Sequence, residues 1–284
     1  MILIDTMQIS LANISMAIKV YGEEVNEGYV RHMILNSLRS YHKQFKEEYG
    51  EMILCYDGGK NWRKEVYPHY KANRKKDREE SSLDWNQIFA WIHGVKDEIK
   101  EYFPYKVIHV DEAEADDCIA VLIQESDPFA NHLIISSDKD FIQLHGTVGC
   151  KQFDPIRKRW LSGNSRESLL EKIFYGDKGD GVPNILSDDT VFIEGRRQTP
   201  LQKKKFESWK SFEDPKTVIP REYHGNYERN KTMVDLWQSP KKVRQDIIAQ
   251  WQEPKETRND KIFGYLVEKK LVQLQGSIQD FFVN

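Results

Sequence analysis

Met1-Ile-Leu-Ile4 runs directly into Asp5, and the same arrangement recurs in two segments far along the chain. Met52-Ile-Leu-Cys-Tyr56 leads into Asp57, and His132-Leu-Ile-Ile-Ser-Ser137 leads into Asp138-Lys-Asp140. Short apolar runs that end at a turn are typical of buried strands in a parallel sheet, and ligands gather beyond the carboxyl ends of such strands. Because several carboxylates there would repel one another without cations, the pattern predicts a metal site at this edge of the sheet.

Helical stretches separate these apolar runs in the first half of the chain. The sequence predicts helices at 30–49, 84–102 and 113–125, and further strands at 105–110 and 148–153, the last at the sheet edge. Alternating strands and helices predict an α/β domain with a central, mostly parallel sheet and helices on both faces. We expect this domain to cover residues 1–155.

The second half of the chain is mainly helical and is expected to form a further domain over residues 156–274. Helices are predicted at 165–175, 201–212, 230–250 and 259–273. Gly176-Asp-Lys-Gly-Asp-Gly-Val-Pro183 is too rich in glycine to continue a helix. Residues 184–200 show no clear periodicity.

The charge of this chain of 284 residues is segregated, although the net charge is only −3. Basic residues dominate Lys60–Arg78, and carboxylates crowd Asp111–Asp117. Such segregation favours a protein that grips polyanions and holds cations; taken alone, the basic run could equally be a solvated helix.

The cysteines give no sign of a disulfide or zinc framework. Cys55, Cys118 and Cys150 are widely spaced, which favours free thiols in a reducing compartment. Asp5 interrupts the first apolar run, so no signal peptide is expected, and no run approaches the roughly 20 apolar residues of a membrane span. We therefore expect a soluble, cytoplasmic monomer.

Nine acidic residues share a position at a strand end, a helix start or a glycine-rich turn. These candidate metal ligands are Asp5, Asp57, Glu114, Asp116, Asp117, Asp138, Asp140, Asp177 and Asp180. Oxygen donors favour magnesium or manganese over zinc, and two such ions can clamp the attacking and leaving oxygens of a phosphodiester. Any single aspartate could instead serve a turn or a helix cap, so the prediction rests on their joint placement.

The basic segment 60–82 carries the features of a single-strand contact. Lys71, Lys75 and Arg78 share one helical face, and aromatic residues between the cations could stack on bases while the cations bind phosphates. The alternative is a solvated helix whose cations pair with Glu79 and Glu80. The predicted DNA contacts are Arg63, Lys64, Tyr67, Tyr70, Lys71, Arg74, Lys75 and Arg78.

Taken together, these residues resemble the 5′ nuclease (flap endonuclease) superfamily, most closely its ribonuclease H branch from T-even-type bacteriophages. The resemblance spans residues 1 to about 183 in family order, and its Glu-Ala-Asp-Asp and Ser-Asp-x-Asp-Phe blocks are specific in combination. The matching stretches are Ile2-Leu-Ile-Asp5, Asp57 with Trp62-Arg63, Tyr70-Lys-Ala-Asn-Arg74, Glu114-Ala-Asp-Asp-Cys-Ile-Ala120, Ser136-Ser-Asp-Lys-Asp-Phe141 with Gln143-Leu144, and Gly176-Asp-Lys-Gly-Asp180.

This resemblance implies two magnesium sites, at which manganese would substitute. The first would use Asp5, Asp57, Glu114 and Asp116; the second Asp138, Asp140, Asp177 and Asp180; Asp117 would lie between them. It also implies that segment 60–82 forms an arch for the 5′ strand. Lys71 and Arg74 would then lie near the scissile phosphate, with Asp138 as a further catalytic residue.

The chain departs from the family pattern after Asp180. Gly181-Val-Pro-Asn-Ile185 keeps the entry to the duplex-binding helix–turn–helix, but Leu186–Thr199 lacks the regular glycine spacing. We expect the motif in modified form, with its potassium site in doubt.

The activity implied is that of a 5′-3′ exonuclease and flap endonuclease. Its substrates would be forked or flap DNA and RNA–DNA hybrids, cleaved to remove primers in phage lagging-strand replication. Three alternatives stay open: a PIN-type ribonuclease, a non-catalytic DNA-binding or clamp-docking accessory protein, and a haloacid-type phosphatase. The last would need paired aspartates after the first strand, where only Asp5 stands.

The segment 275–284 is similar to the peptide by which replication proteins dock on sliding clamps. Its clamp contacts would be Gln275, Ile278, Phe281 and Phe282, grouped on one short turn. A single-strand DNA-binding protein is a further possible partner. The alternative is a tail that folds back on its own domain.

Overall fold

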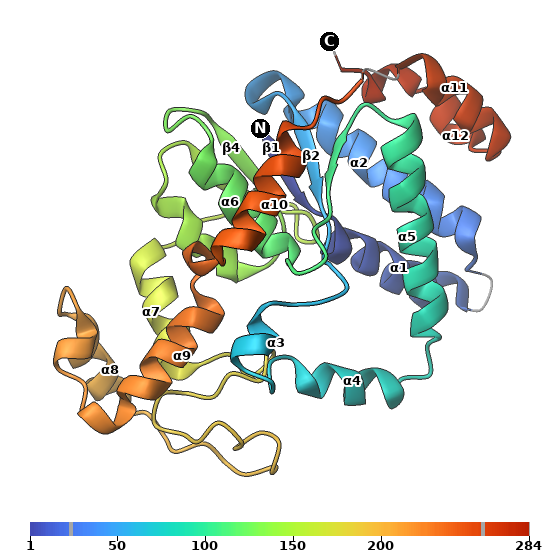
Figure 1. Ribbon diagram of the computed structural model, residues 1–284. Coiled ribbons are helices and arrows are strands. Elements are labelled where there is room, and N and C mark those ends of the chain that lie inside the picture. The colour runs from blue at the N-terminus through green and yellow to red at the C-terminus, as the bar shows by residue number, and fades with distance from the viewer. Residues whose placement is uncertain (23–24, 257–258, 284) are drawn as a thin grey trace.

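The computed structural model describes residues 1–22, 25–256 and 259–283, and in these residues it confirms the α/β architecture (Figure 1). A sheet with the strand order β3-β2-β1-β4-β5-β6 forms the centre, and only the β5–β6 pair is antiparallel. The strands are β1 (Ile2–Asp5), β2 (Met52–Cys55), β3 (Lys106–Ile108), β4 (His132–Ile135), β5 (Cys150–Asp154) and β6 (Arg159–Leu161).

The register of the parallel strands brings the predicted carboxylates to one edge. Ile4 of β1 lies beside Leu54 of β2 and Ile135 of β4. Each of these three residues is followed by an aspartate within three positions. Asp5, Asp57 and Asp138 therefore leave the sheet on the same side.

Successive side chains of each strand point to opposite faces of the sheet, and they pack into two hydrophobic cores, one on each face. Leu3, Ile53 and Ile134 belong to one core, whereas Ile2 and Leu54 belong to the other. The first face is covered by α6 (Ala115–Glu125) and α10 (Lys241–Gln252), and its core continues outward into α7 (Ser165–Tyr175) and α9 (His224–Val234). The second is covered by α1 (Thr6–Tyr21), α2 (Glu27–Tyr49), α5 (Trp85–Tyr102), α11 (Asn259–Glu268) and α12 (Val272–Gln275).

Shorter elements connect this framework. The remaining helices are α3 (Arg63–Val66), α4 (Ala72–Glu79) and α8 (Lys203–Lys210). Short 3₁₀ turns are η2 (Lys139–Gly146), η3 (Pro215–Thr217), η4 (Arg221–Tyr223), η5 (Leu236–Gln238) and η6 (Ile278–Phe281). Within the described part of the chain, no helix is both long and apolar enough to cross a bilayer.

The predicted domain boundary at residue 155 falls inside the sheet. Asp154 ends β5, and its carboxylate accepts hydrogen bonds from the backbone N–H of Ile156 and Arg157, which closes a turn into β6. β6, and not the predicted strand 148–153, thus forms the edge. β6 was missed because three residues, two of them exposed, are too few to form a recognisable apolar run.

The predicted helical domain 156–274 is also divided in space. α7, α8 and α9 form an outlying lobe, whereas α10 returns to pack on α6 and β3, and α11 packs on α5 (Figure 1). The predicted helix 230–250 is two helices, α9 and α10. Pro240 precedes the first residue of α10, because proline cannot occupy a helix interior without losing a hydrogen bond.

Candidate active site

Hydrogen bonds join the ends of β1 and β4 to each other and fasten the end of β2 to the start of α6. Ser136 Oγ, after β4, donates to Asp5 Oδ2 at 3.1 Å. Asp57 Oδ1 accepts from the backbone N–H of Ala115, the first residue of α6, at 2.8 Å. Asp138 Oδ1 accepts from Asp140 N at 2.9 Å. These bonds hold acidic side chains from distant segments at one rim of the sheet.

The ionisation of these side chains shows how closely they crowd. Burial raises the pKa of Asp5 to about 7, and repulsion by Asp57 and Asp138 adds to the effect. Burial, followed by repulsion from Asp138 and Asp5, also raises the pKa of Asp116. Each carboxylate therefore resists ionisation because anions surround it.

Divalent cations suit this donor set, since they bind carboxylate oxygens and would relieve the mutual repulsion. As the side chains stand, however, no three His, Cys, Asp or Glu residues in the described ranges form a group arranged to hold a metal ion. The chemistry of the donors fits a cation, while the division into two metal sites stays a prediction.

The base of the predicted arch is fastened to the outer carboxylates. Lys71 Nζ forms an ion pair with Glu114, and Arg74 binds Asp180 Oδ1 at 2.7 Å. The Tyr70 hydroxyl donates to both Glu114 and Asp180, at 2.9 Å each. Burial opposes ionisation of Glu114, but attraction to Lys71 and Arg63 outweighs it and lowers the pKa of Glu114 to about 2.

Asp180 therefore shares its partners with Glu114, although the resemblance implied different sites for the two. The glycine-rich turn that carries Asp180 is closed by a backbone bridge between Asp177 and Val182. Its Asp180 carbonyl accepts a hydrogen bond from Lys71 N at 2.8 Å. Asp180 thus lies between the two predicted groups of ligands.

Lys172 is a site residue that the sequence analysis missed. Its ammonium lies 2.6 Å from Asp140 Oδ1 and also forms an ion pair with Asp177. Burial raises the pKa of Asp140 to about 6, with repulsion from Asp138 second. The sequence contains no helical-spacing signal for this contact, because α7 ends at Tyr175 and Asp177 lies in the turn beyond it.

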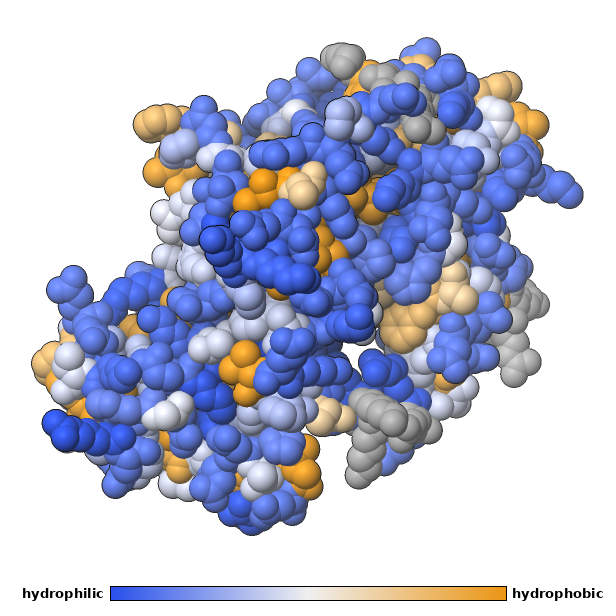
Figure 2. Space-filling model, in the orientation of Figure 1, coloured by the Kyte–Doolittle hydropathy of each residue, from blue (hydrophilic) through white to orange (hydrophobic). Residues whose placement is uncertain are grey.

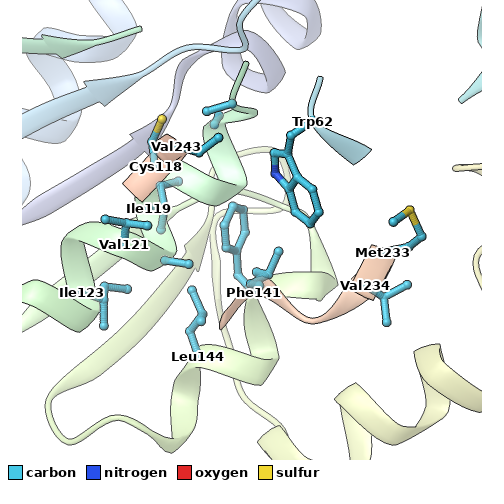
Figure 3. Packing of buried hydrophobic residues seen from close by; sticks show 14 of the residues in the cluster. Trp62, Cys118, Ile119, Val121, Ile123, Phe141, Leu144, Met233, Val234 and Val243 are labelled. Carbon is cyan, nitrogen blue, oxygen red and sulfur yellow. The ribbon is translucent and has the colours of Figure 1, made fainter. Parts of the chain in front are cut away.

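Asp117 and Arg63 serve a structural purpose, contrary to their predicted roles as metal ligand and DNA contact. Both are almost fully buried, and the Arg63 guanidinium donates to the two Asp117 oxygens at 2.8 and 2.9 Å. Asp117 also accepts from Trp62 Nε1 and Ser239 Oγ. Figure 3 shows Trp62 directed into the core beside Phe141 and Met233. Neither charge is available to a substrate.

The predicted stacking aromatics are likewise part of the core. Tyr67 and Tyr70 are buried, and the Tyr67 hydroxyl donates to the carbonyl of Asp189 at 2.7 Å. The two tyrosines support the foot of the predicted arch, and their rings are not exposed for stacking on a nucleobase. Lys64 and Arg78 are exposed as expected, whereas the side chain of Lys75 lies outside the described residues.

The segment after Asp180 forms no helix before α8 in the described residues, and the altered helix–turn–helix stays a prediction. Side chains hold its loop instead: Asn184 Nδ2 donates to the carbonyl of Thr199 at 2.8 Å, and Ser187 Oγ accepts from Thr199 N at 2.9 Å. The loop is therefore ordered by polar contacts in place of glycine-dependent turns.

The tail folds back on the α/β core, as the alternative held. Phe281 is fully buried and packs edge-on against Phe103, with ring centroids 5.3 Å apart. Asp280 forms an ion pair with Arg39 at 2.6 Å, and Ile278 and Phe282 pack against the same core. The Gln275 side chain donates to the carbonyl of Leu266 at 3.3 Å. In the described residues 275–283, the predicted clamp-binding side chains are therefore packed against the protein's own core and do not form an exposed docking motif.

Comparison with known proteins shows the class of protein to which this chain belongs. The 5′-3′ exonuclease, N-terminal resolvase-like domain family matches residues 2–172, and the C-terminal family of T4 RNase H matches residues 163–281. The chain belongs to the 5′-3′ exonuclease family, and it is a nuclease of the flap endonuclease and ribonuclease H type.

Among its relatives, ribonuclease H of Enterobacteria phage T4 is 35% identical over 270 residues, 91% of this chain and 88% of the relative. Flap endonuclease Xni of Shewanella sp. (strain MR-4) is 30% identical over 146 residues, 47% of this chain and 52% of the relative.

Solved structures of the bacteriophage T5 flap endonuclease share the fold at low sequence identity. One was co-crystallised with metal ions, with a TM-score of 0.60, 16% identity, and coverage of 95% of this chain and 98% of that one. Another is a pseudo-enzyme–product complex with DNA and metal ions, with a TM-score of 0.61 and the same identity and coverage.

Proposed function

We propose that this chain is a magnesium-dependent 5′-3′ exonuclease and flap endonuclease that cleaves DNA and RNA–DNA hybrids. The observation that carries the proposal is the convergence of Asp5, Asp57, Asp116 and Asp138 at one sheet edge, with raised pKa values for Asp5 and Asp116. Manganese should substitute, because it shares the preference for oxygen ligands. The helical lobe and the arch distinguish this chain from a PIN-type ribonuclease.

Two groups of carboxylates would hold the ions. Asp5, Asp57, Glu114 and Asp116 would hold one, and Asp138, Asp140, Asp177 and Asp180 the other. When bound, the ions would supply stabilisation of the charge that develops on the attacking and leaving oxygens. The carboxylates position them and do no nucleophilic work.

Lys71, Arg74 and Lys172 would bind the substrate phosphates. In the structure, each pairs with a carboxylate of the site. Once cations neutralise those carboxylates, the ammonium and guanidinium groups are free to turn to an anionic phosphodiester. Cations placed there stabilise negative charge in the transition state.

The biological role that fits this activity is primer removal during phage lagging-strand replication, in the host cytoplasm. A sliding clamp and a single-strand DNA-binding protein stay predicted partners. Because Phe281 is buried, clamp binding through residues 275–284 would require the tail to leave the core.

Substitution of Asp138 by asparagine tests the function. Asparagine keeps the Oδ1 acceptor that Asp140 N uses but removes a negative charge, so cleavage of an end-labelled flap with magnesium should fall by at least about 100-fold, with binding retained. Asp127→Asn, on an exposed turn, is the matched control. Normal turnover by Asp138→Asn would refute the assignment, and absence of cleavage by the native chain with magnesium would favour an accessory protein.

A further inference from the structure

A cavity of about 810 Å³ lies beside the carboxylates, between the end of β2 and the first turns of α5. Asp57 and the backbone of Gly58 and Gly59 line it on the side of the active site. Trp85 and Phe89 of α5 line it as well. In Figure 1, α4 and α5 frame this region next to α1. The volume suits a ligand with one or two planar rings, since such sites usually measure about 300–1,000 Å³.

Two aromatic side chains of α5 line the cavity. Trp85 and Phe89 lie one helical turn apart, with ring centroids 5.9 Å apart and ring planes inclined by 34°. Both rings are only half-buried, and Leu83 and Met7 extend the lining. Most of the face of the molecule shown in Figure 2 is hydrophilic.

The polar groups of the lining suit a nucleotide. Arg78 is exposed at the cavity and provides a guanidinium for a phosphate. Asn86 provides an amide that can both donate to and accept from the edge of a base. The one acidic residue on the α5 side, Asp84, is already engaged because its carboxylate accepts from Gln87 N at 3.0 Å.

We propose that this cavity is a nucleobase subsite in which one unpaired base of the cleaved strand stacks on Trp85 and Phe89. The inference rests on the proposed function, because the phosphodiester would lie at Asp57 and the neighbouring carboxylates. Stacking on aromatic rings tolerates any base, whereas a base engaged in a pair cannot enter. The subsite would therefore select strands whose terminal nucleotide is unpaired.

The test is flap DNA carrying 2-aminopurine at each of the first unpaired nucleotides in turn, bound with calcium in place of magnesium so that the carboxylates are neutralised by an oxygen-binding cation, and read before any cleavage. Native protein should change the fluorescence strongly at one position, and Phe89→Leu should abolish that change. Trp85→Leu is a second variant with the same expected result, and circular dichroism checks that each folds. A response that is equal at all positions, or unaltered by both substitutions, overturns the subsite.

Cleavage kinetics give a second readout. With magnesium, Phe89→Leu should raise KM for the flap about 10-fold, with a smaller effect on kcat. An abasic nucleotide at the responsive position should raise KM equally for the native protein and should add nothing to Phe89→Leu. Phe129→Leu, at an exposed phenylalanine outside the cavity, should behave as the native protein. If the Phe89→Leu substitution and the abasic nucleotide together raised KM by the product of their separate effects, the proposal would be overturned.

The two proposals fail in different ways. If native protein binds the probe with a position-specific signal but does not cleave with magnesium, the nuclease proposal fails and the subsite is supported. If it cleaves while the fluorescence is insensitive to both α5 substitutions, the subsite fails and the nuclease proposal stands.

Discussion

At the scale of single residues, the acidic side chains divide into those that crowd one another and one that is fully satisfied. Asp5 and Asp116 have raised pKa values because burial and neighbouring anions oppose their charge. Asp117, one residue further, is neutralised by Arg63 and takes hydrogen bonds from Trp62 and Ser239. The sequence motif alone therefore does not distinguish Asp116 from Asp117. The two differ in their neighbours, because Asp117 has a buried arginine as its partner, whereas neighbouring anions oppose the charge of Asp116.

The Arg63–Asp117 pair makes a direct stability prediction. Arg63→Met should lower the free energy of unfolding by about 3–5 kcal/mol, because it leaves a buried carboxylate without its counter-charge. The double variant Arg63→Met/Asp117→Leu should recover part of that loss, which urea unfolding would measure. Equal losses in the single and double variants would contradict an uncompensated charge as the cause.

His132, at the start of β4, gives a pH prediction. Burial, followed by the positive N-terminus, lowers its pKa from 6.5 to about 4. Below pH 6.5 the unfolded chain takes up a proton that the folded chain refuses until about pH 4, so the stability contributed by the neutral ring is lost across that window. His132→Gln should flatten the dependence of unfolding free energy on pH between 6.5 and 4. An unchanged slope in thermal or urea unfolding would contradict this.

At the scale of elements, a helix could be located from the sequence when its buried apolar residues recur regularly along one face. α7 begins and ends at the predicted residues 165 and 175, and α5 begins one residue after the predicted start at 84 and ends at the predicted residue 102. α1 was missed because its apolar residues face both ways, with Ile9 and Ile14 buried but Met16 and Val20 exposed. Periodicity alone cannot locate such a helix.

The candidate site was predictable to a similar degree. The strand-end aspartates were located because a parallel sheet places its carboxyl ends together. Lys172 and the α5 aromatics were not, because only tertiary packing brings α7 and α5 to the same edge. The roles of Tyr67, Tyr70 and Arg63 were misjudged, since an aromatic-basic segment gives no sign of which side chains turn inward.

The η6 turn of the tail can be tested as a structural element. Phe281→Ala should cost about 3–5 kcal/mol of unfolding free energy, since a fully buried phenylalanine is removed. Gln279→Ala, at an exposed position of the same turn, should cost less than about 0.5 kcal/mol. If both substitutions left denaturant unfolding unchanged, the tail would not be part of the core in solution.

At the scale of the whole molecule, the crowded carboxylates couple metal binding, pH and stability. The folded pKa of Asp5, about 7, lies above its ordinary value of 3.8. The metal-free fold therefore loses stability as the pH rises from about 3.8 to about 7, because the unfolded carboxyl is already ionised there while the folded one keeps its proton. Magnesium binding should offset this cost, since a ligand of the folded state stabilises it.

The measurable consequence is a pH-dependent effect of magnesium on thermal unfolding. The rise in Tm on adding magnesium should be larger at pH 8 than at pH 6. Magnesium binds ionised carboxylates, and at pH 6 it must first displace the protons that some of them still carry. Asp138→Asn should reduce the rise at pH 8. A magnesium effect of the same size at both pH values would show that proton release does not accompany binding.

The return of the last elements to the first half of the chain has a consequence for biosynthesis. Phe103 and Tyr105 are covered by Phe281, which leaves the ribosome long after them. Until synthesis ends, the nascent N-terminal half has an uncovered aromatic surface of the kind that invites aggregation. A stop codon shortly before residue 278 should therefore yield insoluble protein, although every proposed metal ligand has already been translated.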